Sequence, residues 1–87
     1  MMDFRVRQLQ YFLVLAEHLN FNHAARELQI PQPTLSFQIK SLEAALDVRL
    51  FDRNQRHVQL TSSGVRLRKH ARTILKQAHR AILDIQH

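Results

Sequence analysis

The chain has 87 residues, of which 45% are hydrophobic; this is enough for one small folded domain, or a part of a larger protein, and it excludes general disorder. It has no cysteine, no apolar run near the roughly 18 residues of a membrane span and no signal-peptide pattern, so we expect a cytoplasmic protein without disulfides or thiolate metal sites. Thirteen Lys and Arg residues against seven Asp and Glu give a net charge of +6, which favours a polyanionic partner such as nucleic acid or an acidic membrane surface.

Residues 7–19 are predicted to form an amphipathic helix. Its apolar residues recur at spacings of three and four: Leu9, Phe12, Leu13, Ala16 and Leu19. The segment Asn20-Phe21-Asn22 interrupts this pattern. Asn22 is predicted to cap a second, short helix that runs from His23 to Leu28.

A third helix is predicted from Gln32 to Leu46, after a tight turn at Gln29-Ile30-Pro31. Pro33 falls in its first turn, where the missing N–H costs nothing. Its inward face consists of Leu35, Ile39, Leu42 and Leu46. Two helices joined by a short turn match a helix-turn-helix, although any two packed helices give a similar pattern.

Phe37 does not belong to the inward face of this third helix. At about 100° per residue, its side chain points almost directly away from Leu35, Ile39 and Leu42. Soluble domains seldom direct a phenylalanine at water. The pattern therefore predicts that Phe37 contacts a binding partner.

After Asp47 the period of the pattern changes to two. Val48 to Arg53 and Arg56 to Leu60 are predicted to form two short strands around a turn at Asn54-Gln55. A hairpin directly after a helix-turn-helix is a wing. Its tip is flanked by Arg53 and Arg56.

A long final helix is predicted from Ser62 to the end of the chain, with Thr61 as its cap. One side has an apolar stripe close to the 3.5-residue period of a helix–helix seam: Leu67, Ala71, Ile74, Ala78, Ala81 and Ile85. The opposite side is basic, with Arg66, Lys69, Arg72, Lys76 and Arg80, and no acidic residue lies between Arg53 and Arg80. The stripe predicts pairing with the same helix of a second copy. The alternatives are that the helix folds back onto its own domain and that its basic side is merely solvated.

These elements and residues resemble the N-terminal domain of LysR-type transcriptional regulators over about residues 6–87. The resemblance rests on the stretches "LQYFLVLAEHLNFNHAARELQI", "QPTLSFQIKSLEAAL" and "VRLFDRNQRHVQLTSSG" and on the helix that follows. It implies a mostly helical winged helix-turn-helix at residues 4–61, with the helix-turn-helix itself at about 21–40, and a linker helix at 62–87 that pairs antiparallel with that of a second subunit. It also implies a C-terminal domain that binds a small-molecule inducer. That domain is not present in this chain, so no cofactor is expected here.

The resemblance extends to single positions and departs at three of them. Gln32 and Pro33 match the pair that begins the recognition helix, Ser36 matches the family serine, and Arg56 matches the arginine of the wing. Pro31 stands where a capping serine is common. Asp47 replaces the usual glycine just past the third helix, where left-handed backbone geometry is expected at a cost of about 1 kcal/mol for aspartate. Phe37 replaces what is commonly an arginine.

Contacts with DNA are predicted from three elements. The third helix would read base edges with Gln32, Pro33, Thr34, Ser36, Phe37 and Lys40. Gln32 suits the N6/N7 edge of adenine, and Lys40 suits a phosphate or a guanine. Pro33 and Phe37 make only apolar contacts, for which the major groove offers the thymine methyl group. Phosphates or a narrow minor groove would be contacted by Asn22, His23 and Arg26 of the second helix and by Arg53 and Arg56 of the wing.

The leading hypothesis is a sequence-specific regulator that binds inverted-repeat, double-stranded DNA as a homodimer, with no membrane partner. Two alternatives come from other classes: a dimerisation or protein-interaction module, and a nonspecific architectural DNA binder. The six histidines show no metal-ligand spacing, and the glutamates have no neighbouring histidine or serine arrangement. We therefore expect neither a metal site nor an enzyme.

Overall fold

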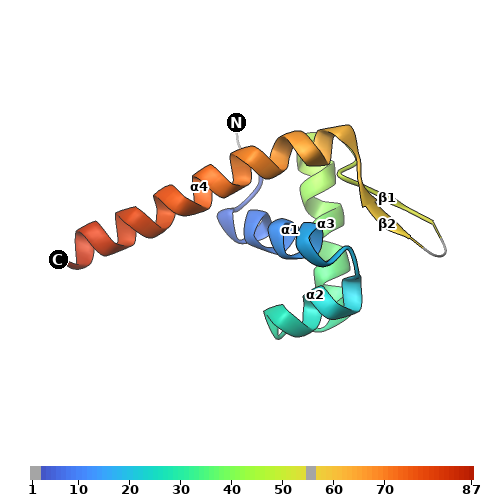
Figure 1. The fold of residues 1–87 in the computed structure, drawn as a ribbon, viewed down its shortest axis with the longest axis horizontal. Coiled ribbons are helices and arrows are strands. Elements are labelled where there is room, and N and C mark those ends of the chain that lie inside the picture. Colours follow the sequence, from blue (N-terminus) through green and yellow to red (C-terminus); the bar gives the residue numbers. More distant parts are fainter. Residues whose placement is uncertain (1–2, 55–56) are drawn as a thin grey trace.

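The winged helix-turn-helix predicted from the sequence is present in the computed structural model, which describes residues 3–54 and 57–87 (Figure 1). Within these residues lie four helices and a two-stranded antiparallel sheet: α1 (Val6–His18), α2 (Phe21–Leu28), α3 (Gln32–Leu46), β1 (Phe51–Arg53), β2 (Val58–Leu60) and α4 (Ser62–Gln86). The predicted fold class, three helices and a wing followed by one long helix, is confirmed.

Helix α1 is the element on which the other helices pack, since it contacts α2, α3 and α4. Leu9, Phe12 and Leu15 of α1 are fully buried. The Phe12 ring centroid lies 5.5 Å from that of Phe51 in β1, with the ring planes tilted by 54°. Such tilted aromatic pairs are favourable beyond the area that they bury, so this pair joins the wing to α1. The rest of the core comes from Ala16, Ala24, Ala25, Leu35, Ile39, Leu42, Leu50 and Ala71.

The first three helices all end at a non-glycine residue in the left-handed region of the backbone. These residues are Leu19, Gln29 and Asp47, with φ values of 51°, 58° and 56°. Asp47 thus has the geometry expected from its place in the family pattern, and its N–H donates to the Ala44 carbonyl at 3.2 Å. Because this region costs a non-glycine residue about 1 kcal/mol, the packing of the helices, and not local preference, must hold these ends in place.

The beginnings of α2 and α3 differ in how they are capped. Asn20, not Asn22, caps α2: its side-chain oxygen accepts the His23 N–H at 2.9 Å. The prediction of Asn22 as the cap was wrong because α2 includes Phe21, which packs against the core from the first helical position. At α3 the capping position is occupied by Pro31, which has no side-chain hydrogen bond, as expected from the loss of a serine there.

The strands of the wing are shorter than predicted, and they pair Phe51 with Leu60 and Arg53 with Val58. Residues 48–50 lie outside the ladder. The Leu50 N–H donates to the side chain of Glu43, and the Leu50 carbonyl accepts the Thr61 N–H at 3.0 Å. The Thr61 bond continues the register of the two strands, whereas the Leu50 N–H is bound by Glu43 and not by a strand partner. The turn was predicted at Asn54-Gln55: the Asn54 N–H donates to the His57 carbonyl at 3.1 Å and the Asn54 side-chain oxygen accepts the His57 N–H at 2.8 Å, whereas Gln55 and Arg56 lie outside the described residues.

Helix α4 begins against the segment that leads into the wing, and Gly64 permits this close approach. A Cβ atom at Gly64 would overlap the carbonyl oxygen of Leu50 and lie 2.7 Å from Cδ2 of Leu60. Thr61 caps α4 as predicted, because its hydroxyl accepts the Gly64 N–H at 3.0 Å. The same hydroxyl donates to the Arg49 carbonyl at 2.6 Å. The hydrogen bonds of Thr61 and the close approach at Gly64 therefore hold the start of α4 against the base of the wing.

Farther along, α4 leaves the domain and projects as a single helix (Figure 1). This projection gives the molecule its elongated shape of 48 × 28 × 19 Å. No helix in the described part of the chain is both long enough and apolar enough to cross a membrane.

We expect Gly64→Ala to lower the free energy of unfolding, although replacing glycine by alanine in a helix ordinarily raises it by up to about 1 kcal/mol. The sign is reversed because the added methyl group meets the Leu50 backbone, which cannot rotate away. Urea or thermal unfolding measures the effect. The control is Gln77→Ala on the exposed part of α4, which should change stability by less than about 0.5 kcal/mol. A stabilised Gly64→Ala protein would show that the start of α4 moves away from Leu50 without cost.

Candidate nucleic-acid interface

Helix α3 has one face in the core and one face in solvent. Leu35, Ile39 and Leu42 are fully buried, whereas the Phe37 side chain is 68% exposed. The predicted outward orientation of Phe37 is therefore confirmed. Gln8 of α1 also donates to the side-chain oxygen of Gln38 at 3.1 Å, which fixes α3 against α1. The outward side chains of α3 are thus presented from a helix with a fixed orientation.

The outward face of α3 contains little charge. Of the residues predicted to read bases, Pro33, Thr34, Phe37 and Lys40 are exposed, and Gln32 and Ser36 are half-buried. Lys40 is the only charged side chain among them. Hydrogen-bonding groups lie at the N-terminal end of this face, and the Phe37 ring lies near its middle. This mixture of amide, hydroxyl and apolar groups suits the base edges of a major groove better than a row of phosphates.

Helix α2 presents its predicted phosphate contacts to solvent. Asn22, His23 and Arg26 are exposed. The His18 ring, at the end of α1, pairs with the Glu27 carboxylate at 2.6 Å and lies edge-on to the His23 ring, with centroids 6.4 Å apart. Arg26 forms no ion pair within the described part of the chain, so its charge is free for an external anion. Nowhere in residues 3–54 and 57–87 do three His, Asp or Glu side chains come together as a metal site.

Glu43 is a buried carboxylate that connects α3 to the wing. Its Oε2 accepts the N–H groups of Leu50 and Phe51, at 2.7 and 3.2 Å, and its Oε1 accepts Nη2 of Arg53 at 3.0 Å. A buried charge is costly unless it is paired and hydrogen-bonded, and here both oxygens have partners. Glu43 therefore holds β1 at a fixed position relative to the recognition helix.

The sequence contains a signal for this role that lies outside the motifs. At 100° per residue, Glu43 falls at the edge of the buried face, one position after Leu42 and four after Ile39. A charged residue at the edge of a buried face needs a partner. The partner is not apparent from local sequence, because Arg53 lies ten residues away.

Arg53 was predicted to contact phosphate, and this stays a prediction; within the domain its guanidinium already has partners. Its guanidinium pairs with Glu43 and lies over the Phe21 ring, 5.2 Å from the centroid, in a cation–π contact. The Arg53 side chain is only 22% exposed, and its buried Nε finds no hydrogen-bond partner among the described residues. Arg53 therefore stabilises the join between the wing, α3 and α2. Arg56, which lies outside the described residues, stays a prediction.

The apolar stripe of α4 is divided between the chain's own core and solvent. Ala71 is fully buried, and Leu67 packs partly buried against the core, where α4 meets α1. Ala71 has no exposed surface for a second copy, so its predicted contact is corrected; for the half-buried Leu67 the contact stays a prediction. Beyond them the stripe emerges: Ile74 and Ile85 are exposed, the latter to 82%. Ala78 is half-buried and Ala81 is exposed.

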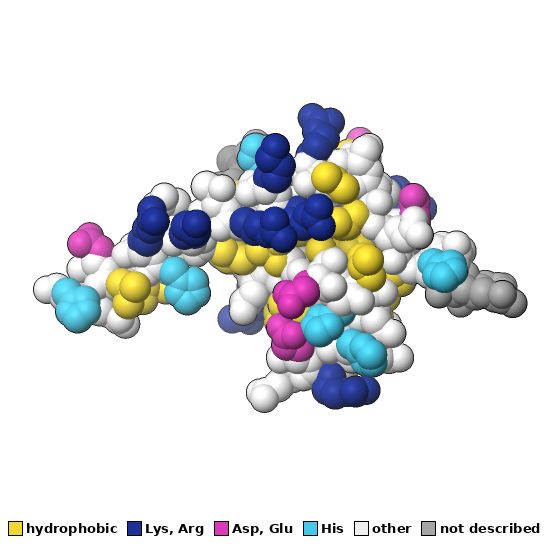
Figure 2. Space-filling view, in the orientation of Figure 1, with side chains coloured by type: hydrophobic (Ala, Val, Ile, Leu, Met, Phe, Trp, Pro, Cys, Tyr) yellow, Lys and Arg dark blue, Asp and Glu magenta, His cyan; other side chains and the backbone are white. Residues whose placement is uncertain are grey.

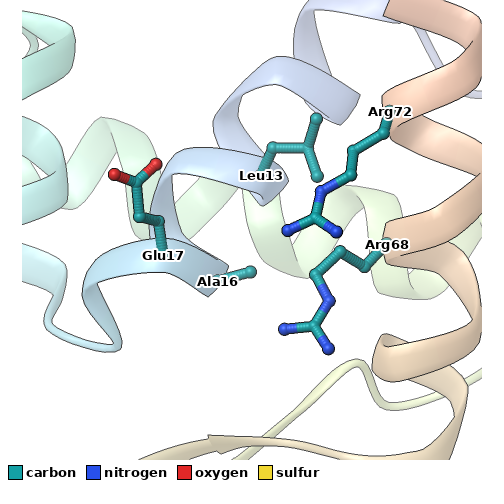
Figure 3. Close-up of a pocket in the computed structure, with 5 residues that line it drawn as sticks. All are labelled: Leu13, Ala16, Glu17, Arg68 and Arg72. Atoms are coloured by element: carbon teal, nitrogen blue, oxygen red, sulfur yellow. The ribbon is translucent and has the colours of Figure 1, made fainter.

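The other surfaces of α4 carry positive charge that no acid of the described residues pairs with. Arg66, Lys69, Arg72, Lys76 and Arg80 are all exposed, and Figure 2 shows a row of Lys and Arg side chains along α4. A hollow of about 260 Å³ lies between α1 and α4, with Leu13 and Ala16 in its lining. Figure 3 shows the guanidinium groups of Arg68 and Arg72 directed from α4 toward α1, with the carboxylate of Glu17 pointing away from them.

Comparison with known proteins gives a consistent family match. The model of the bacterial regulatory helix-turn-helix proteins of the lysR family matches residues 6–65. The chain is 46% identical over 77 residues to the transcriptional regulator AlsR of Bacillus subtilis (strain 168), covering 88% of this chain and 26% of AlsR. It is 44% identical over 72 residues to the DNA-binding transcriptional dual regulator OxyR of Escherichia coli (strain K12), covering 83% of this chain and 24% of OxyR. The chain thus spans about a quarter of the length of these curated relatives.

Solved structures with the same fold include complexes with DNA. The CbnR DBD–DNA complex superimposes with a TM-score of 0.90 at 38% identity, covering 94% of this chain and 94% of the CbnR chain. The complex of the BenM DBD with catB site 1 DNA gives a TM-score of 0.89 at 33% identity, covering 94% of this chain and 92% of the BenM chain. At these identities the likeness extends to sequence as well as to backbone.

We expect Glu43→Gln to destabilise the domain, because the amide nitrogen that replaces one oxygen cannot accept the hydrogen bonds made there. Hydrogen bonds to a charged group contribute about 1.5–3 kcal/mol each, so a loss of at least 1.5 kcal/mol is expected in urea unfolding. Glu17→Gln is the matched control, since Glu17 is exposed and has no hydrogen bond or ion pair in the described part of the chain. Equal effects of the two changes would show that the wing does not depend on this carboxylate.

Proposed function

The chain belongs to the LysR family of bacterial regulatory helix-turn-helix proteins, and we propose that it is the part of a transcriptional regulator that binds inverted-repeat, double-stranded DNA as a homodimer. The observation that carries this proposal is the outward face of α3, where an exposed Phe37 is surrounded by hydrogen-bonding side chains on a helix whose other face is buried. A face of this kind serves a ligand that has both methyl groups and hydrogen-bonding edges. The major groove is such a ligand.

The proposed contacts come from α3, α2 and the wing. Side chains of α3 read base edges: Gln32, Pro33, Thr34, Ser36, Phe37 and Lys40. Phosphates are neutralised from α2 by Arg26, with Asn22 and His23 beside it, and from the wing by Arg56. The similarity to domains crystallised with DNA supports this arrangement. Sites on chromosomal DNA would place the protein in the bacterial cytoplasm.

The exposed half of the α4 stripe supports pairing between two copies. Ile74, Ala78, Ala81 and Ile85 continue the face that α1 covers nearer the domain. In a parallel pair, the two winged domains and the two basic surfaces of α4 would lie together at the same end of the helix pair. Antiparallel pairing separates both, so we propose that two α4 helices pair antiparallel and present two recognition helices to the two halves of an inverted repeat.

The remaining parts of the proposal concern the whole regulator. An inducer would bind in a domain outside this chain, so none of the residues described here is assigned to a small molecule. The family is one of regulatory proteins, and the proposed contacts require no catalytic group. A protein-interaction module would leave the polar residues around Phe37 without a role. A nonspecific binder would need the charge of α4 more than the chemistry of α3.

Selection of bound duplexes from a random pool, followed by mobility shift at several salt concentrations, tests the DNA-binding proposal. We expect the selected inverted repeat to bind at least about 10³-fold more tightly than random DNA. Lys40→Ala should weaken binding to the selected site, whereas Lys76→Ala, the same change on exposed α4, should not. Equal losses with no preference for the selected site would favour the nonspecific binder. Absence of binding at low salt would favour the interaction module.

Sedimentation equilibrium of the 87-residue chain tests the pairing of α4. We expect self-association, which Ile85→Glu should abolish because it places a charge in the apolar seam. Leu83→Glu is the control, since Leu83 is also exposed but lies on the other side of α4. A chain that stays monomeric at high concentration, or equal effects of the two variants, would contradict the proposed seam.

A further inference from the structure

Phe37 is unusual for its exposure and for its position. Outside α4, no other large apolar side chain in residues 3–54 and 57–87 is as exposed. It lies in the middle of the helix that we propose to enter the major groove, where residues that reach a base usually carry hydrogen-bonding groups. Its ring has none.

The neighbours of Phe37 reinforce this apolar character. Side chains in a helix lean toward the preceding turn, so the ring is directed over Pro33 and Thr34 and away from Lys40. Pro33 is exposed and offers only ring carbons at its side chain, and Thr34 adds a methyl group and one hydroxyl. On this side of the ring, Pro33 and the Thr34 methyl group offer apolar surface, and the Thr34 hydroxyl is the polar group of these two side chains.

The chemistry of the groove determines what such a patch distinguishes. The apolar group of a base pair in the major groove is a methyl group at C5 of the pyrimidine, present in thymine and absent from cytosine. Thymine and 5-methylcytosine share this methyl group but differ at C4, where thymine has an acceptor and cytosine a donor. A side chain with hydrogen-bonding groups tells the two apart by the C4 substituent. A phenyl ring contacts the methyl group and makes no hydrogen bond to either substituent.

We propose that Phe37, with Pro33 beside it, recognises the C5 methyl group of a pyrimidine irrespective of the base that carries it. The DNA sites of this protein then include positions where cytosine methylated at C5 substitutes for thymine. Methylation of cytosine at such a position creates a binding site, and loss of the methyl group removes it. This inference rests on the DNA binding proposed above.

The test varies the methyl group and the base independently at one position. Selection with the wild-type protein and with Phe37→Ala first identifies the position whose thymine preference the variant loses. Four duplexes are then compared at that position in both half-sites: T·A, U·A, 5-methyl-C·G and C·G. We expect T·A and 5-methyl-C·G to bind alike, and U·A and C·G to bind more weakly, by about fourfold for each buried methyl group. The four duplexes are compared with the wild-type protein alone; if Phe37→Ala does not fold, the comparison is made at each thymine of the selected half-site.

The variants then assign the effect to the ring. Phe37→Ala should bind all four duplexes alike, with a melting temperature close to that of the wild type because the ring is exposed. Val65→Ala, an exposed apolar side chain on α4, should retain the wild-type pattern.

Two results would overturn the inference and leave the proposed function intact. One is equal binding of T·A and U·A; the other is tighter binding of T·A and U·A than of 5-methyl-C·G and C·G. The first means that the methyl group is not read, and the second that hydrogen bonds read the base pair. If no duplex binds better than random DNA, the proposed function fails, and this inference fails with it.

Discussion

The carboxylate of Glu43 is the contact on which the geometry of the binding face depends. It lies at the end of the recognition helix and accepts hydrogen bonds from two successive backbone N–H groups at the start of the wing. Arg53 neutralises its charge and stacks on Phe21 at the start of α2. One ion pair therefore connects all three elements that the proposed function places against DNA. The positions of α2, α3 and β1 relative to each other follow from this pair and from the packing of α1 beneath them.

Most of the positive charge and the side chains proposed to read bases lie on different helices. The outward face of α3 has one lysine among its predicted base contacts, while six Lys and Arg residues lie on α4, away from that face. A recognition helix with so little charge gains little from phosphates and depends on fit to particular base edges. One such helix reads only a few base pairs, so the proposed homodimer, with two copies of α3, would bind a site more tightly than one copy. The exposed apolar stripe of α4 would pair two copies and so supply the second recognition helix that a weakly charged one needs.

Much of the fold follows from local patterns in the sequence. The bounds of α3, the outward Phe37 and the Thr61 cap are each determined by a few neighbouring residues, and the structure contains all of them. The differences arise where a distant residue competes with the local pattern. Glu43 accepts the N–H of Leu50 that strand pairing would use, and it also pairs with the guanidinium of Arg53. Ala71 fits the spacing of the apolar stripe of α4, but in the structure α1 covers it. The spacing alone does not show this.

Because α4 is continuous, it affects which DNA sites the proposed dimer can bind. The helix runs without a break from Gly64, fastened to the wing, to the exposed Ile85. In the proposed antiparallel pair, the point at which two helices overlap therefore sets the distance between the two recognition helices. Each residue of overlap corresponds to about 1.5 Å, and sliding one helix by a turn moves a recognition helix by about 5.4 Å, which exceeds the 3.4 Å rise of one base pair. The spacing between half-sites is accordingly a property of the linker helix, and the sequence of each half-site is a property of α3.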